Sequence, residues 1–280
     1  MDIDRSDLSQ RSVRNRFIGV FDILGFSNLI KNTNMTMLRQ IIAFLHHDTN
    51  LARGIGSDPT SPKAHSMNRT CPIKAISLSD TIFLYTENDS SISLDDIVKV
   101  SAILWLLLCT AGLPIRGAIA RGESYCDYDQ HYVYGKAVLE AHYYESIQDW
   151  AGIVLAPSCF KTIAHKNKIA HLEKRRYLSM YHAPTKNGPI EMYCLRWMLP
   201  LDGFIEATEY RYRSDPWPRW IRDSFIMYTR DGDFDEKVIR KIRNTLLFYY
   251  NNMAIPENVS EDLVDEILSE RPFLRGAISK

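Results

Sequence analysis

The stretch Phe17-Ile-Gly-Val-Phe-Asp-Ile-Leu-Gly-Phe-Ser27 decides the fold of the first part of the chain. Its apolar and partly β-branched residues are typical of a buried strand. Asp22 interrupts this apolar run, and a buried carboxylate is costly unless another group pairs with it. Gly25 then lets the backbone turn, and Ser27 is suited to cap a helix. The stretch therefore predicts a central strand that ends in a carboxylate and is followed by a helix.

A second carboxylate interrupts a hairpin pattern further along the chain. Residues 73–85 form two short alternating apolar runs around Ser79-Asp80, as two strands joined by a tight turn would. Hard divalent cations take oxygen ligands and are often held by one or two carboxylates plus substrate phosphates. Either aspartate alone is most simply a turn or cap residue. Because both interrupt strands, the pair of Asp22 and Asp80 indicates one divalent-metal site.

The composition restricts the class of protein. The chain has 280 residues, is 45% hydrophobic, and carries 34 basic and 34 acidic residues, so a sizeable core is expected and no nucleic-acid partner is indicated. Five scattered cysteines form no Cys-x-x-Cys pair, which fits a reducing cytosol and argues against structural zinc. The N-terminus has no signal sequence, and the apolar run 102–109 is too short to span a membrane. We therefore expect a cytoplasmic protein.

Apolar runs and helical periodicities alternate from residue 28 to residue 165, around a polar stretch at 53–71 that predicts a loop. The expected helices are 28–52, 93–111, 136–147 and 158–165, and the further expected strands are 115–123, 131–134 and 152–156. This order predicts an α+β domain with helices packed on one sheet.

The two aspartate motifs together resemble the class III nucleotidyl cyclases. In that family the first strand ends in Asp, a hydrophobic residue, a variable residue, Gly-Phe, and Ser or Thr, and residues 22–27 have this pattern. The family's second Asp lies at the turn of the next hairpin, as Asp80 does. The resemblance covers roughly residues 15–165 and is greatest to the bacterial pyrimidine cyclases of anti-phage defence, which make cyclic UMP or cyclic CMP. It implies a ferredoxin-like βαββαβ core.

The resemblance also implies the roles of particular residues. Two Mn²⁺ or Mg²⁺ ions would be held by Asp22, Asp80 and the backbone carbonyl of Ile23, and would activate the ribose 3′-hydroxyl and neutralise phosphate charge. Arg116 would contact the polyphosphate, with Arg121 as a second candidate, and a guanidinium suits this task. Because the two arginines are five residues apart, a regular strand would point them to opposite faces. They are equally well interpreted as surface arginines. The motif residues Phe21, Gly25 and Phe26 are expected at the nucleotide.

Base recognition is where the chain departs from the purine cyclases. Their base-reading Lys and acid correspond here to Ile76 and Tyr132, so the expected substrate is a pyrimidine nucleotide, UTP rather than CTP. Tyr132 could alternatively be a core tyrosine. The transition-state Asn and Arg of the family correspond to Leu139 and Tyr143, which leaves the usual mechanism incomplete unless Arg121 or Lys136 substitutes.

The resemblance further implies a homodimer with its sites between subunits, and a separate effector protein that reads the cyclic nucleotide. We divide the chain into a catalytic domain, residues 1–185, and a small C-terminal accessory domain, residues 186–280. The basic stretch 166–186 is interpreted as a solvated face or linker, followed by a strand at 190–195. Interleaved aromatic and arginine residues at 210–220 could bind nucleic acid, but nearby acids oppose this. Helices are expected at 233–253 and 260–269.

Three rival interpretations are open. The first is a degenerate cyclase domain that binds a nucleotide without catalysis, which the loss at Leu139 and Tyr143 favours and the two retained aspartates oppose. The second is a related palm-type nucleotidyltransferase, although the hairpin reads Ser77-Leu-Ser-Asp80 and lacks the Gly-Gly-Asp-Glu-Phe signature of diguanylate cyclases. The third is a structural or partner-binding protein whose two aspartates are turn residues.

Overall fold

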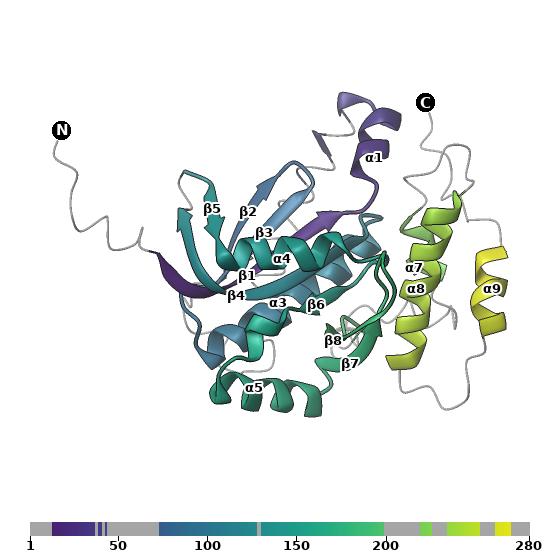
Figure 1. Cartoon of the computed structure of the whole chain (residues 1–280). Helices are drawn as coiled ribbons and strands as arrows, with labels where there is room; N and C mark the ends of the chain where they lie inside the picture. The colour runs from purple at the N-terminus through teal and green to yellow at the C-terminus, as the bar shows by residue number, and fades with distance from the viewer. Residues whose placement is uncertain are drawn as a thin grey trace, which may run out of the picture.

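The motif strand forms β1 (Arg14–Ile23), which lies between β3 (Thr81–Tyr85) and β4 (Ile115–Asp127) in the computed structural model (Figure 1). The structure describes residues 13–36, 39–40, 43, 73–127, 130–198, 219–225, 234–252 and 261–269. Nearly every residue of β1 from Phe17 to Ile23 is buried, as its apolar composition predicts, and Asp22 is the partly exposed exception.

One sheet organises the described residues, with the strand order β2-β3-β1-β4-β6-β8-β7 and β5 paired beside β4. Its remaining strands are β2 (Lys74–Leu78), β5 (Tyr132–Gly135), β6 (Ile153–Leu155), β7 (Leu178–Ala183) and β8 (Ile190–Leu195). The β4–β6 pair is parallel and the other pairs are antiparallel. The expected α+β class with helices on a mixed sheet is thus confirmed.

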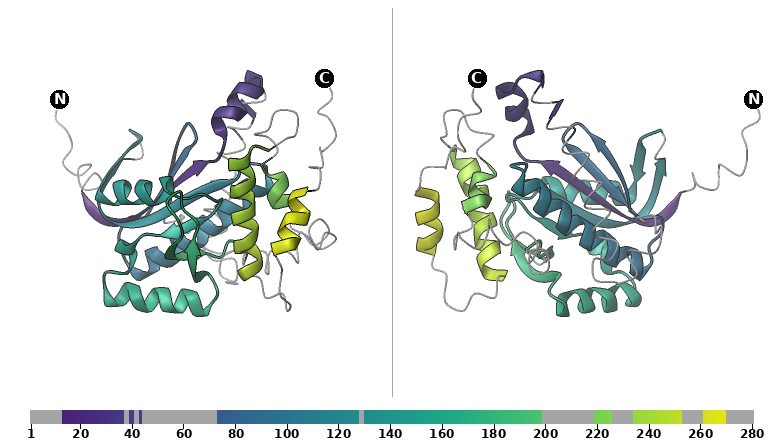
Figure 2. Two further views of the ribbon diagram at one scale, coloured as in Figure 1. Left: turned by 45° about the vertical axis from the view of Figure 1, so that its right-hand side comes forward. Right: turned by 180° about the vertical axis from the view of Figure 1, so that it is seen from behind.

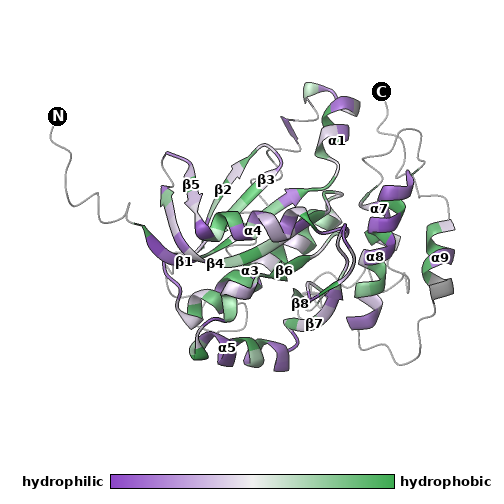
Figure 3. Cartoon of the chain, in the orientation of Figure 1, coloured by the Kyte–Doolittle hydropathy of each residue, from purple (hydrophilic) through white to green (hydrophobic). Residues whose placement is uncertain are grey.

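Helices cover both faces of this sheet (Figures 1 and 2). On one face, α4 (Lys136–Ser146) packs over β1 and β4 through a small core that includes Ile18, Val20 and Ala141. On the opposite face lie α3 (Ser91–Thr110) and α5 (Ile163–Lys174), within a larger core. Figure 3 shows the hydrophobic residues concentrated along α3 and the central strands.

Two shorter helical segments complete this part of the chain. Helix α1 (Phe26–Asn32) follows β1 directly, and the 3-10 helix η2 (Pro157–Phe160) follows β6. The expected helix 28–52 is corrected at its start, because α1 begins at Phe26 and already ends at Asn32, where Thr33 is extended. Most of residues 37–52 and the whole expected loop 53–71 lie outside the described residues. The structure splits the expected helix 158–165 into η2 and the start of α5.

Residues 166–186 are not a linker, whereas most of their charged side chains are exposed, as the alternative of a solvated face predicts. This stretch contains most of α5 and all of β7. Few of its residues are apolar, but two of them, Ile169 and Leu172, are buried in the core. The expected strand 190–195 is confirmed as β8, and it lies in the central sheet between β6 and β7. The expected boundary at residue 185 therefore falls in the connection between two paired strands.

The C-terminal helices α7 (Arg219–Asp223), α8 (Glu236–Asn252) and α9 (Glu261–Ser269) pack beside the sheet domain. Their buried residues, including Ile221, Leu246 and Ile267, belong to the same core as α3. Trp105 of α3 stacks on Trp197, with ring centroids 3.7 Å apart. The separate accessory domain stays a prediction. No helix among the described residues combines the length and hydropathy needed to cross a membrane.

Candidate functional site

The end of β1 meets the turn of the β2–β3 hairpin, which brings Asp22 and Asp80 into one neighbourhood. The Ile23 N–H donates to the backbone carbonyl of Asp80 at 3.1 Å, and Asp22 lies opposite Thr81 in the β1–β3 ladder. Burial raises the pKa of the Asp22 carboxyl; the charge of Arg116 lowers it, and the charge of Asp80 raises it further. The two aspartates are therefore neighbours in space, and the metal site expected of them stays a prediction.

Arg116 is the cation that faces Asp22. The two residues lie opposite each other in the β1–β4 ladder, and Arg116 Nη2 is 3.1 Å from Asp22 Oδ2. Arg116 Nε forms an ion pair with Glu145 Oε1 at 2.7 Å, without the alignment of a hydrogen bond. Its Nη1 donates to the backbone carbonyl of Gln148 at 3.1 Å. The arginine fork therefore joins β1, α4 and the segment after α4.

Sequence reasoning missed Glu145, the most deeply buried carboxylate of this group. Its side chain is 3% exposed and also lies 3.3 Å from His142 Nδ1. Burial raises the pKa of Glu145, although Arg116 opposes this. A sequence signal existed: Ala137, Ala141 and Glu145 recur every four residues, so they share the face that α4 buries. A carboxylate on a buried helix face requires a partner.

The donor set fits a divalent cation that is shared with a substrate. Asp22 and Asp80 supply carboxylate oxygens close enough for their charges to repel, which a cation would relieve. Among the residues that the structure describes, no three His, Cys, Asp or Glu side chains are arranged to enclose a metal. Two carboxylates completed by substrate oxygens therefore match the site better than a closed metal centre does.

Arg121 lies away from this group. It is opposite Phe17 in the β1–β4 ladder, and its Nε donates to Asp89 Oδ2 at 2.8 Å on the other face of the sheet. The alternation of side chains along a regular strand explains the difference from Arg116. The structure thus corrects the expectation that Arg121 joins the site, and Lys136 pairs instead with Glu123 on an exposed surface.

The motif residues around Asp22 serve the fold in different ways. Phe21 and Phe26 are buried in the core on the α3 side rather than exposed toward a nucleotide. Gly25 adopts a left-handed backbone, with φ of 77°, at the start of α1, which a glycine allows without strain. Ile76 is buried in the small core beneath α4. Ile23 contacts Asp80 only through its backbone N–H among the hydrogen bonds described.

Tyr132 lies far from Asp22 within one chain. It pairs with Asp127, the last residue of β4, whereas Arg116 lies near the first. Residues 116 and 127 are roughly 35 Å apart along an extended strand. Its side chain is 58% exposed, so it is not a core tyrosine. Leu139 and Tyr143, one turn apart on α4, are also exposed. Tyr134 is exposed as well, but it stacks on Tyr125 on the face of the β4–β5 hairpin away from α4, because the neighbouring Val133 packs into the core beneath α4. The exposed pair Leu139 and Tyr143 is called the α4 surface below.

Comparisons with known proteins give a distant likeness. No family model matches the chain, and no curated protein matches it. Two solved structures of a bacterial light-regulated adenylyl cyclase align with 70% of the chain, at 13% and 14% identity and TM-scores of 0.44 and 0.41. The chain spans 58% of the length of each. At TM-scores below 0.5, this likeness supports no conclusion about activity.

Proposed function

We propose that the chain is a nucleotidyl cyclase that converts a pyrimidine nucleoside triphosphate, UTP in preference to CTP, to its 3′,5′-cyclic monophosphate and pyrophosphate. The observation that carries the proposal is the convergence of Asp22, Asp80 and Arg116 at one end of the sheet. A carboxylate pair beside a guanidinium is suited to a metal-bound polyphosphate.

The residues have distinct roles in this proposal. Asp22 and Asp80 would hold Mn²⁺ or Mg²⁺, two ions per site in a two-metal mechanism, and the ions would supply activation of the 3′-hydroxyl and neutralisation of phosphate charge. Arg116 would turn from Asp22 toward the polyphosphate once a cation takes its place. Glu145 keeps Arg116 at the site, since it pairs with the guanidinium from α4 while Asp22 pairs with it from β1.

A homodimer completes the proposal. Tyr132 is too far from Arg116 to join its own site, so a second copy would have to present it. The exposed α4 surface is the natural contact, because Leu139 and Tyr143 would otherwise leave apolar area in water. By resemblance, the product would be a second messenger of anti-phage defence, made in the cytoplasm and read by a separate effector.

A cyclase-like domain that binds a nucleotide without catalysis is the second candidate. It is favoured by the exposed Leu139 and Tyr143, which stand where the family has its transition-state Asn and Arg. Both candidates predict metal-dependent nucleotide binding, and they differ only in turnover.

Product analysis separates these candidates. The purified protein is incubated with ATP, GTP, CTP or UTP and Mn²⁺, with Asp80→Ala as the control, and products are identified by mass. One cyclic pyrimidine monophosphate that disappears in Asp80→Ala is the expected result. A cyclic purine product would contradict the assignment from Ile76 and Tyr132. Binding of a triphosphate with no product would favour the non-catalytic domain.

A further inference from the structure

The segment between α4 and β6, residues 147–152, contacts both the candidate site and the C-terminal helix α8. Its first contact is with the site, because the Gln148 carbonyl accepts from Arg116 Nη1. Gln148 itself is held firmly: its Nε2 donates to Gly117 O at 2.8 Å and to Tyr144 O at 2.9 Å. Its Oε1 accepts from Trp150 Nε1 at 2.9 Å. The acceptor for Arg116 is therefore part of a buried network.

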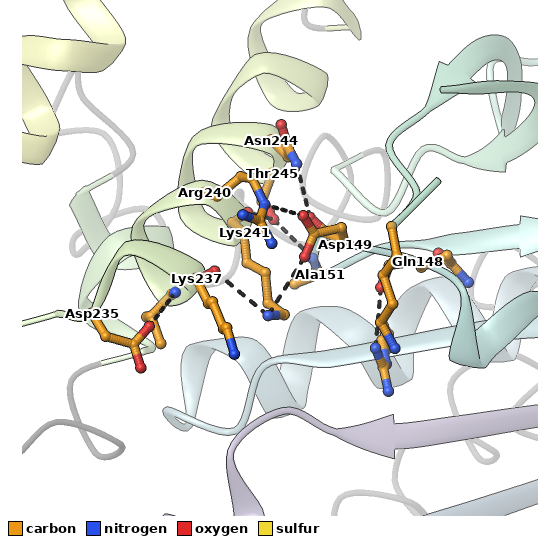
Figure 4. A network of polar contacts seen from close by, with 12 residues as sticks. Gln148, Asp149, Ala151, Asp235, Lys237, Arg240, Lys241, Asn244 and Thr245 are labelled. Carbon is orange, nitrogen blue, oxygen red and sulfur yellow. Dashed lines mark hydrogen bonds and ion pairs between the residues drawn. The ribbon is translucent and has the colours of Figure 1, made fainter. Parts of the chain in front are cut away.

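The second contact is with one face of α8 (Figure 4). The buried Asp149 carboxylate pairs with Arg240 and, at 3.5 Å, with Lys241 Nζ. Asn244 Nδ2 donates to the Asp149 carbonyl at 2.8 Å. The Ala151 N–H donates to Thr245 Oγ1 at 2.9 Å, and this hydroxyl donates to the Lys241 carbonyl at 2.8 Å. Two adjacent residues of α8, Asn244 and Thr245, thus hold the backbone on each side of Trp150, and the preceding turn of α8 holds the Asp149 side chain.

The electrostatics connect the same groups. Burial lowers the pKa of Lys241, Asp149 raises it, and the charges of Arg116 and Arg240 lower it further. The field of the site arginine therefore reaches α8, more than a hundred residues later in the sequence. Asp149 is the negative charge that lets Arg240 and Lys241 approach this already cationic region.

We propose that α8 positions Arg116, with Asn244 and Thr245 as positioning residues that act through the backbone of residues 148–151. Without their hydrogen bonds, the segment can shift, and the Gln148 carbonyl no longer fixes one arm of the guanidinium. Arg116 then retains only its two carboxylate contacts, and its orientation toward a polyphosphate becomes variable. Small displacements of this kind reduce binding and turnover because polyphosphate recognition depends on geometry.

The inference rests on the proposed function only for the consequence on catalysis; the coupling between α8 and Arg116 is a property of the fold. The C-terminal helices would thereby act on the site through a defined path, although they do not supply a ligand to it. A displacement of α8 by a bound molecule would use the same path.

The test is the exchange of the Arg116 Nη1–H₂ protons with water, measured by ¹⁵N NMR on the full chain without nucleotide or metal, because Nη1 is the donor to the Gln148 carbonyl. The signal is assigned by its loss in Arg116→Lys. The test variant is Asn244→Ala with Thr245→Val, which changes no charge. The matched control is Asn252→Ala, the same substitution on the same helix, where the amide donates only to Phe248 O among the described hydrogen bonds. The single variant Asn244→Ala is used if the double variant fails to fold.

We expect the Nη1–H₂ exchange to be at least about threefold faster in the test variant and unchanged in the control, because a charge-assisted contact weakens when its geometry loosens. In an active enzyme, KM for the nucleotide should rise by a similar factor at unchanged secondary structure. Unchanged Arg116 exchange in the test variant would overturn the inference. If exchange is faster in the test variant but neither the wild type nor any variant forms a cyclic nucleotide, the link between α8 and Arg116 is supported and the proposed function is wrong.

Discussion

Arg116 is the residue on which the proposed chemistry depends, because one side chain meets acceptors on three elements. Lysine keeps the charge but has no planar fork, so it cannot reproduce contacts to Asp22, Glu145 and Gln148 together. We predict that Arg116→Lys lowers kcat/KM at least about 10-fold. We predict that Arg116→Ala, which leaves Glu145 buried without its cation, lowers the free energy of unfolding by roughly 3 kcal/mol.

Steady-state kinetics and urea denaturation measure these two effects. Arg14→Lys is the control, because Arg14 meets Glu87 at 3.6 Å on an exposed part of β1, where an ion pair contributes little. A fully active Arg116→Lys enzyme would remove the polyphosphate role from this residue.

Glu145 makes a prediction about pH. Its pKa is raised above the ordinary value of 4.5 by burial, so the folded state binds a proton more tightly than the unfolded state. The contribution of Glu145 to stability is therefore fully present below pH 4.5 and is lost as pH rises through the raised pKa. We predict that Glu145→Gln flattens the fall in stability above pH 4.5. Denaturant midpoints measured from pH 4 to pH 7 test this.

Glu123 is a control of opposite sign. Lys136 lowers the pKa of Glu123 through a hydrogen bond and its charge, so the stability contributed by this pair is lost as pH falls. Glu123→Gln should therefore leave the slope above pH 4.5 unchanged. Equal slopes in wild type and Glu145→Gln would show that Glu145 is not a proton acceptor in this window.

A site residue could be predicted from the sequence only where its own neighbours in the chain mark it as unusual. Asp22 and Asp80 could be found because each interrupts an apolar strand pattern, whereas Arg116 was expected from the family resemblance. Glu145 was visible only as a charge on the buried face of α4, and its partner lies 29 positions earlier on another element. For Arg121, the alternation of side chains along a strand predicts that it faces away from Arg116. Its partner, Asp89, could be found only in the structure.

At the scale of elements, the β2–β3 turn aims Asp80 and carries a backbone constraint. Ser79 has φ of 56°, the left-handed region that a β-branched residue tolerates poorly. We predict that Ser79→Val lowers the free energy of unfolding by about 1 to 2 kcal/mol and weakens Mn²⁺ binding, whereas Ser79→Gly preserves both. Thermal melts and Mn²⁺ titration measure these effects. A Ser79→Val variant with unchanged Mn²⁺ affinity would show that the turn does not position Asp80.

The elements that the sequence predicted well have strong periodicity. Helix α3 has a Ser90 cap, a continuous apolar interior and a turn at Gly112, and it spans nearly the expected residues. Helix α5 and strand β7 were missed because few of their residues are buried and their charges resemble those of a linker. Their stability comes from tertiary contacts, of Ile169 and Leu172 in α5 and of Leu178 and Ala183 in β7, which no local pattern records.

At the scale of the whole molecule, the relation of the C-terminal helices to the sheet was not predictable. Their amphipathic patterns indicate helices, but a pattern does not identify the surface that buries its apolar face. The structure joins Leu246 and Phe248 to the same core as Trp105. For this reason the change in composition leads to the expectation of a separate accessory domain. The core that the C-terminal helices share with α3 could not be predicted from the sequence.

The proposed dimer makes the last prediction, which concerns how two copies share a site. If Tyr132 of one copy completes the Asp22–Asp80 site of the other, Asp22→Ala and Tyr132→Ala inactivate different halves of that site. An equal mixture of the two inactive variants, allowed to exchange subunits, then contains half heterodimers, each with one intact site. The mixture should recover about one quarter of wild-type activity. A mixture of Asp22→Ala with Asp80→Ala is the matched control, because both variants damage the same half and no site is restored. Recovery in neither mixture, with dimers present by sedimentation, would show that the two copies do not share a site through Tyr132 and that the exposed α4 surface has another partner.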